Sequence, residues 1–156
     1  QDAAKVMGAR GDFLGNFGGL ERKFTQLAEA FPQDKYDWRP GAGVRSVCEV
    51  FVHITVENYD MGKAFGGPAA PAALGNGDKC IGNKAAVIAA MKASFAAIRA
   101  AVTNTKDADL EGTYTLFGAN QARRTWLLGI AEHAGEHLGQ QIAYARVNGI
   151  VPPWSK

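Results

Sequence analysis

The chain of 156 residues has a formal net charge of +2 at pH 7, and 47% of its residues are hydrophobic. So small a charge does not indicate nucleic-acid binding, and the basic doublet Arg123-Arg124 is of a kind common on solvated helix faces. No uninterrupted apolar run approaches the ~20 residues that cross a bilayer. We therefore expect no membrane span and one globular domain over residues 1–156.

The sequence begins with Gln1 and not with Met. A cleaved signal peptide and a removed expression tag explain this start equally well. The first explanation predicts an exported, periplasmic protein, and the second predicts a cytoplasmic one. The two cysteines, Cys48 and Cys80, do not decide between these compartments by themselves.

A first amphipathic helix is predicted between Asp12 and Phe31. Asp12 is a suitable N-cap, and Pro32 ends the helix. Three glycines in its first half weaken it locally or permit close packing by a neighbouring helix. Its apolar residues recur at steps of four and three, at Phe13, Phe17, Leu20, Phe24 and Leu27.

Residues 33–44 form a turn-rich connection, and we expect its aromatic residues to cover one end of the core. Ser46 and Glu49 then have the spacing of a capping box, so a second helix is predicted to start there. Its apolar stripe consists of Val47, Val50, Phe51, Ile54 and Met61. His53 lies at the edge of that stripe.

The remaining chain contains a long loop and two further helices. Residues 66–83 are rich in Gly and Pro, and we interpret them as a crossover or lid. The third helix carries Ile88, Met91, Phe95, Ile98 and Val102 at alternating steps of three and four. Residues 104–119 are polar and turn-like, with a short extended piece at 113–117. The fourth helix is predicted from about Asn120 to Asn148, ending at Gly149. Four amphipathic helices without sustained strands indicate an all-α four-helix bundle.

Two of the three histidines, His133 and His137, lie four residues apart on the fourth helix and project from one face. They occupy a predicted core stripe, where a buried imidazole needs partners for its nitrogens. A single buried histidine is most often satisfied by a backbone carbonyl or a nearby Glu. The pair together with His53 instead favours a site in which all three histidines bind one divalent metal ion.

Other metal motifs fit these residues less well. A zincin has Glu directly after its first histidine, where this chain has Ala134. A carboxylate-bridged di-iron bundle has Glu three residues before histidine, a position taken here by Val50 and Ile130. Cys48 points about 140° away from His53 around the helix and is a poor fourth ligand.

The depth of each histidine along its helix constrains the topology. His53 lies about 10 Å into the second helix, and His133 and His137 lie roughly 20 to 26 Å into the fourth. Their levels match if these two helices are antiparallel, which requires a long crossover between the second and third helices. This arrangement also brings Cys48 near Cys80. A disulfide is expected there if the protein is exported, and two unconnected thiols otherwise.

Three groups of residues resemble the DinB/YfiT-like superfamily. They are Trp38-Arg39-Pro40 with Ser46-Val47 ahead of His53, His133-x-x-x-His137 followed by Gly139-Gln140, and the run Tyr-Ala-Arg-Val-Asn-Gly-Ile-Val-Pro-Pro at 144–153. The resemblance implies a four-helix bundle with a long crossover, a metal site at the three histidines, and homodimers. Characterised relatives include thiol-dependent transferases and isomerases, while many members have no assigned activity.

Three imidazoles leave at least one coordination position for water or substrate, and zinc and nickel both suit them. Glu57, one turn after His53, is our candidate for proton transfer, with a solvated surface charge as the alternative. Gln140 and Tyr144 are candidates to contact a small-molecule substrate. Our first hypothesis is a metal-dependent enzyme that activates water or a thiol for transfer or hydrolysis. The second is a non-catalytic metal-binding or stress-related bundle acting by interaction or sequestration.

Overall fold

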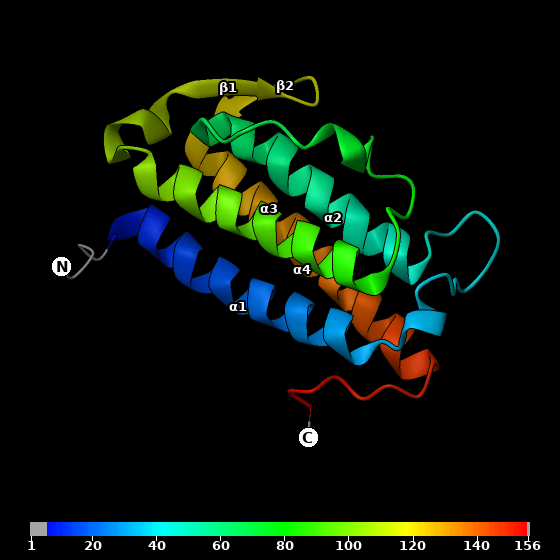
Figure 1. Cartoon of the computed structure of the whole chain (residues 1–156). Coiled ribbons are helices and arrows are strands. Elements are labelled where there is room, and N and C mark those ends of the chain that lie inside the picture. Colours follow the sequence, from blue (N-terminus) through cyan, green and yellow to red (C-terminus); the bar gives the residue numbers. More distant parts are fainter. Residues whose placement is uncertain (1–5, 156) are drawn as a thin grey trace.

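Four long helices carry the fold of this computed structural model, which describes residues 6–155 (Figure 1). They are α1 (Gly8–Ala30), α2 (Val47–Gly62), α3 (Lys84–Asn104) and α4 (Arg123–Val147). A hairpin of two short strands, β1 (Thr113–Leu116) and β2 (Ala119–Ala122), precedes α4. The predicted all-α four-helix bundle is confirmed.

The helices run in two parallel pairs. The colours of Figure 1 show that α2 and α3 run in one direction while α1 and α4 run in the other. Both α1 and α2 pack against α3 and α4. The predicted antiparallel arrangement of α2 and α4 is therefore present, and the crossover at residues 66–83 connects the two helices that share a direction.

Aromatic side chains from three helices and one connection fill the core. Phe17 and Phe24 of α1 both pack against Phe95 of α3, with ring centroids 4.9 and 5.7 Å apart. Phe51 of α2 meets Tyr36 from the connection after α1, and both are buried. The expectation that this turn-rich connection covers one end of the core is confirmed.

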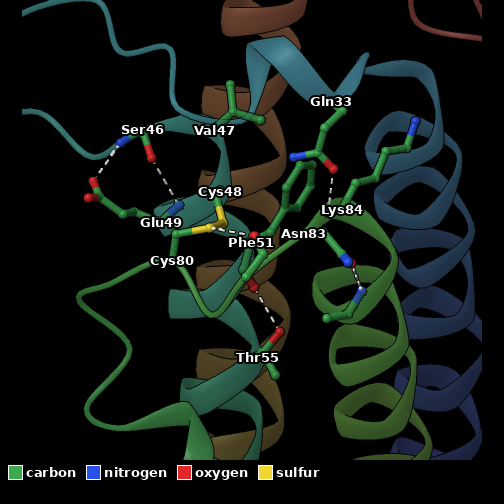
Figure 2. The surroundings of a disulfide bond; sticks show 12 residues. Gln33, Ser46, Val47, Cys48, Glu49, Phe51, Thr55, Cys80, Asn83 and Lys84 are labelled. Carbon is green, nitrogen blue, oxygen red and sulfur yellow. Dashed lines mark hydrogen bonds between the residues drawn. A yellow bond between two sulfur atoms is a disulfide. The ribbon is translucent and has the colours of Figure 1, made fainter.

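The N-terminus of α2 follows its predicted capping box (Figure 2). The Glu49 backbone N–H donates to Ser46 Oγ at 3.2 Å, and the Ser46 N–H donates to Glu49 Oε2 at 2.8 Å. A second set of hydrogen bonds joins α1 to α3. Lys84 Nζ donates to the carbonyls of Glu29 and Phe31, so a side chain at the start of α3 caps the C-terminus of α1.

Two predicted helix starts are wrong. The first helix begins at Gly8 and not at Asp12, which lies inside it. The fourth begins at Arg123 and not near Asn120, because residues 119–122 pair with residues 113–116 in the hairpin. Phe117 and Gly118 form its two-residue turn, both with positive φ (51° and 78°). The expected extended piece therefore exists, but it has a partner strand that the sequence did not reveal.

Helix α3 is long and apolar enough to cross a membrane by length and composition, with a mean hydropathy of 1.6. No membrane span was expected from the sequence, because Lys92 and Arg99 interrupt the apolar run in this helix. In the bundle, this helix buries Val87, Met91, Phe95, Ile98 and Val102 against its neighbours, as the core helix of a bundle does.

Cys48 and Cys80 form a disulfide with a Cα–Cα distance of 5.4 Å (Figure 2). Cys48 lies in the first turn of α2 and is buried, whereas Cys80 lies near the end of the crossover and is partly exposed. The bond therefore ties the crossover to the start of α2. Of the two alternatives that the sequence left open, the structure contains the disulfide.

Candidate metal centre

The three histidines of the chain meet between α2 and α4. One nitrogen from each of His53, His133 and His137 lies within 4.8 Å of the other two, and all three side chains are partly buried. His53 Nε2 and His133 Nε2 are 3.3 Å apart. This convergence is the one expected from the depth of each histidine in antiparallel helices.

The donors fit a metal ion in number and type, and one pair of them also fits in separation. Two nitrogens bound at 2.0–2.1 Å to a tetrahedral zinc are about 3.3–3.4 Å apart, and the observed separation between His53 and His133 is 3.3 Å. Two neutral imidazole nitrogens at that distance gain little from each other unless one donates a hydrogen bond or both bind a shared cation. The three residues therefore form a candidate site for one divalent ion.

The surroundings keep two of the imidazoles neutral. Burial lowers the pKa of His53 to about 4, aided by the positive charge of Arg45 and by the other two histidines, while Asp78 opposes the shift. Burial also lowers the pKa of His133 to about 4, with His137 and Arg45 contributing. Because a histidine must be unprotonated to bind a metal, both are ready as ligands at pH 7.

A chain of hydrogen bonds orients His137. Gln140 Oε1 accepts from His137 Nδ1 at 2.7 Å, Gln140 Nε2 donates to the Tyr144 hydroxyl at 2.8 Å, and that hydroxyl donates to the Arg45 carbonyl at 3.1 Å. The first bond fixes the proton on Nδ1 and leaves Nε2 with its lone pair, which is how proteins commonly prepare a ligating histidine. Trp38 packs edge-on against Tyr144.

His133 has no comparable partner. Its Nδ1 is buried and makes no hydrogen bond with any residue that the structure describes. An unpaired buried nitrogen costs free energy. The orientation of His133 therefore rests on packing against α2, including an edge-on contact with the His53 ring.

Both histidines of α4 flank its buried stripe and do not form part of it, contrary to the sequence expectation. The stripe passes through Ala134, Leu138 and Gln141, while His133, His137 and Gln140 are only partly buried. Gln141, which the sequence analysis overlooked, is buried and donates to the Val47 carbonyl at 2.7 Å. It joins α4 to the first turn of α2 close to the site.

A cavity of about 630 Å³ opens beside His137. Its lining includes Val44, Arg45, Asp78, Glu136 and Gln140. Gln140, predicted to contact substrate, thus lines the cavity and also holds His137, whereas Tyr144 is buried behind Gln140. The cavity gives a small molecule access to His137, the one histidine of the three in its lining.

The crossover forms one wall of the site. Gly77 is buried with φ +81°, and a Cβ placed there would lie 3.2 Å from Val56 Cβ and 3.4 Å from the His53 Cα. The next residue, Asp78, pairs with Arg45 at 3.1 Å. Arg45, Gly77 and Asp78 were not predicted to belong to the site. The turn sequence Gly-Asn-Gly-Asp at 75–78 was the available signal, but it did not reveal which helix the loop contacts.

Glu57 lies one turn after His53 on α2 and is partly buried. Its pKa is raised by burial and by the negative charges of Asp60 and Asp78, against the pull of Arg45. No hydrogen bond joins it to a histidine among the described residues. Its role in proton transfer stays a prediction.

The fold and the site together define a helical bundle with a three-histidine candidate metal centre between antiparallel helices. A family model described as the DinB superfamily matches residues 17–141, which is most of the chain and includes all three histidines. The chain belongs to the DinB superfamily.

One solved structure supports the same fold. The crystal structure of a DinB-like protein from Bacillus cereus ATCC 10987 matches with a TM-score of 0.78 and 16% sequence identity, over 90% of this chain and 93% of that chain. A search of curated proteins found no match. At this identity the comparison shows the fold and carries no residue roles.

Proposed function

We propose that this protein is a metal-dependent enzyme that acts on a small molecule, with His53, His133 and His137 as the metal ligands. The observation that best supports this proposal is that the three imidazoles converge within 4.8 Å, with His137 at the side of a cavity. Zinc and nickel suit an all-imidazole set. The 3.3 Å separation of two ligand nitrogens matches tetrahedral zinc, so we place zinc first.

A bound divalent ion would supply a Lewis acid that lowers the pKa of water or a thiol and makes it a nucleophile at neutral pH. The residues of this chain have separate tasks around it. Gln140 and Tyr144 hold His137 in one tautomer. Glu57, one turn after His53 and with a raised pKa, is our candidate to accept and return a proton.

The cavity favours catalysis over sequestration. A site that only stores metal is served best by four protein ligands and closed packing, whereas three ligands beside an open cavity leave a position for an exchangeable molecule. Its volume of about 630 Å³ lies within the ~300–1,000 Å³ range of small-molecule sites. Transfer or hydrolysis on a small molecule is the reaction class that this arrangement supports.

Metal analysis of untagged protein, together with His53→Ala and His137→Ala, tests the ligand set. We expect one divalent ion per wild-type chain and a loss of that ion in both variants. Lys35→Ala, a change outside the site, is the control and should retain its metal. Unchanged metal content in both histidine variants would refute the site.

The enzyme proposal needs a second measurement. Protein loaded with cobalt in place of the native metal should change its visible absorption spectrum when azide is added, because an open coordination position can take the anion. A spectrum that azide leaves unchanged, with cobalt bound at the histidines, would instead support the sequestering bundle.

A further inference from the structure

We propose that Arg45 forms a carboxylate-binding subsite next to the metal centre, so that the substrate is a small carboxylic acid anchored at two points. This inference rests on the proposed function and names the class of its substrate. Arg45 lines the same cavity as His137 and is the arginine of that lining, whose described residues include no lysine.

The backbone of Arg45 is fixed relative to the site. Its carbonyl accepts the Tyr144 hydroxyl, which is the last link of the hydrogen-bond chain from His137. Arg45 directly precedes Ser46, the N-cap of α2, so the capping box also restrains its position. Arg45 therefore stands at a defined place beside the imidazoles.

Most N–H donors of the Arg45 guanidinium have no partner among the described residues. Among the described residues, only its Nη2 has a partner, the Asp78 carboxylate at 3.1 Å. An arginine presents five N–H donors in a planar fork that matches a carboxylate. The side chain is 39% exposed, so a ligand in the cavity can reach it. Arg39, by contrast, is engaged by both Glu49 and the Val44 carbonyl.

Asp78 orients Arg45 from one side. Its Oδ2 accepts from Asn76 Nδ2 at 2.7 Å, and its backbone N–H donates to Asn76 Oδ1, so the carboxylate is held by its own turn. The Cys48–Cys80 disulfide anchors the same stretch of the crossover two residues later. Asp78 thus holds one edge of the guanidinium against a fixed loop and leaves the other edge for a ligand.

The charges around the cavity suit a ligand with two different groups. A bound divalent ion and the Arg45 guanidinium would give the site two separate positive points, while Asp78 and Glu136 bring negative charge to the rest of the lining. Such an arrangement favours a ligand that carries a metal-binding atom at one end and a carboxylate at the other.

Two probes of similar size test this subsite on the cobalt-loaded full chain. Imidazole-4-acetate can bind the metal through its ring and Arg45 through its carboxylate, whereas 4-methylimidazole has only the ring. Neither probe reduces the disulfide. Dissociation constants come from the change in the visible spectrum. We expect wild type to bind imidazole-4-acetate roughly ten- to a hundredfold more tightly than 4-methylimidazole, as for hydrogen bonds to charged groups.

Arg45→Met should abolish this preference, so that the two dissociation constants become about equal, while Arg45→Lys should retain part of it. Arg39→Met is the matched control, a nearby arginine outside the cavity lining, and should keep the full preference. Equal binding of both probes by normally loaded wild type would overturn the subsite and leave the metal site standing. A wild type that takes no cobalt at the histidines would overturn the proposed function as well.

Discussion

Reduction of the Cys48–Cys80 disulfide should lower the stability of the metal-free protein by about 4 kcal/mol. The two cysteines are 32 residues apart in the sequence. The chain-entropy relation for a loop of this length gives about 12 cal/mol/K, or about 4 kcal/mol at 25 °C. The loss arises mainly in the unfolded state, because the reduced chain gains conformations that the closed loop excludes.

Urea unfolding at 25 °C, followed by circular dichroism in the presence of a chelator, measures this difference. With a urea dependence of about 2 kcal/mol/M, the midpoint should fall by about 2 M on reduction. Oxidised and reduced wild type have the same side chains, so their comparison isolates the crosslink, and mass spectrometry confirms each redox state. Cys48→Ala/Cys80→Ala should be no more stable than reduced wild type. Midpoints of oxidised and reduced protein within roughly 0.3 M would refute the reasoning.

Three further changes have defined outcomes. Gly77→Ala should cost about 1–3 kcal/mol in urea unfolding and weaken metal binding, because φ +81° and the 3.2 Å approach to Val56 Cβ on α2 both oppose a Cβ. Phe117→Asn should stabilise the protein by about 1 kcal/mol, since Asn accepts the positive φ at this turn position more readily than Phe. Metal-free protein should lose stability as the pH falls from 6.5 to about 4. In that window the unfolded state protonates His53 and His133, and the folded state, with pKa values of about 4, does not.

Each of these expectations has a contradicting result. A Gly77→Ala variant with wild-type stability would show that the space between the crossover and α2 accommodates a Cβ at this position. A Phe117→Asn variant less stable than wild type would show that the contact between Phe117 and Trp126 outweighs the turn conformation. For the pH dependence, the control is His53→Ala/His133→Ala, in which the loss of stability between pH 6.5 and 4 should shrink. An equal loss in that variant would assign the effect to other groups.

Features that depend on a few neighbouring residues could be predicted from the sequence. The capping box at Ser46 and Glu49 and the stop before Pro32 involve contacts within one turn. The proximity of His53 to His133 and His137 was also predictable. The rise per residue of a helix gives the depth of each histidine along its helix, and these depths agree only if the two helices are antiparallel. The direction of the crossover followed from this constraint, and the bundle itself from the four amphipathic patterns.

Features that depend on distant contacts were missed. The start of α4 was placed too early because nothing in residues 119–122 alone shows that they pair with another strand. His133 and His137 were wrongly assigned to the buried stripe of α4. Adjacent residues on a helix lie 100° apart around its axis, and the sequence alone does not show which side the neighbouring helices cover. The closure of Gly77 onto His53 likewise depends on where an eighteen-residue loop lies, which its composition does not determine.

The spacing of the crosslinking residues along the chain sets an order for biosynthesis. Cys48 and Cys80 are 32 residues apart, whereas His53 and His133 are 80 apart and belong to the second and last helices. Since the ribosome delivers the N-terminal part first, both cysteines are present in a nascent chain well before α4 is made. A chain that ends before α4 keeps both cysteines but only one of the three histidines. A metal ion held by all three would therefore mark the chains in which α4 has been made.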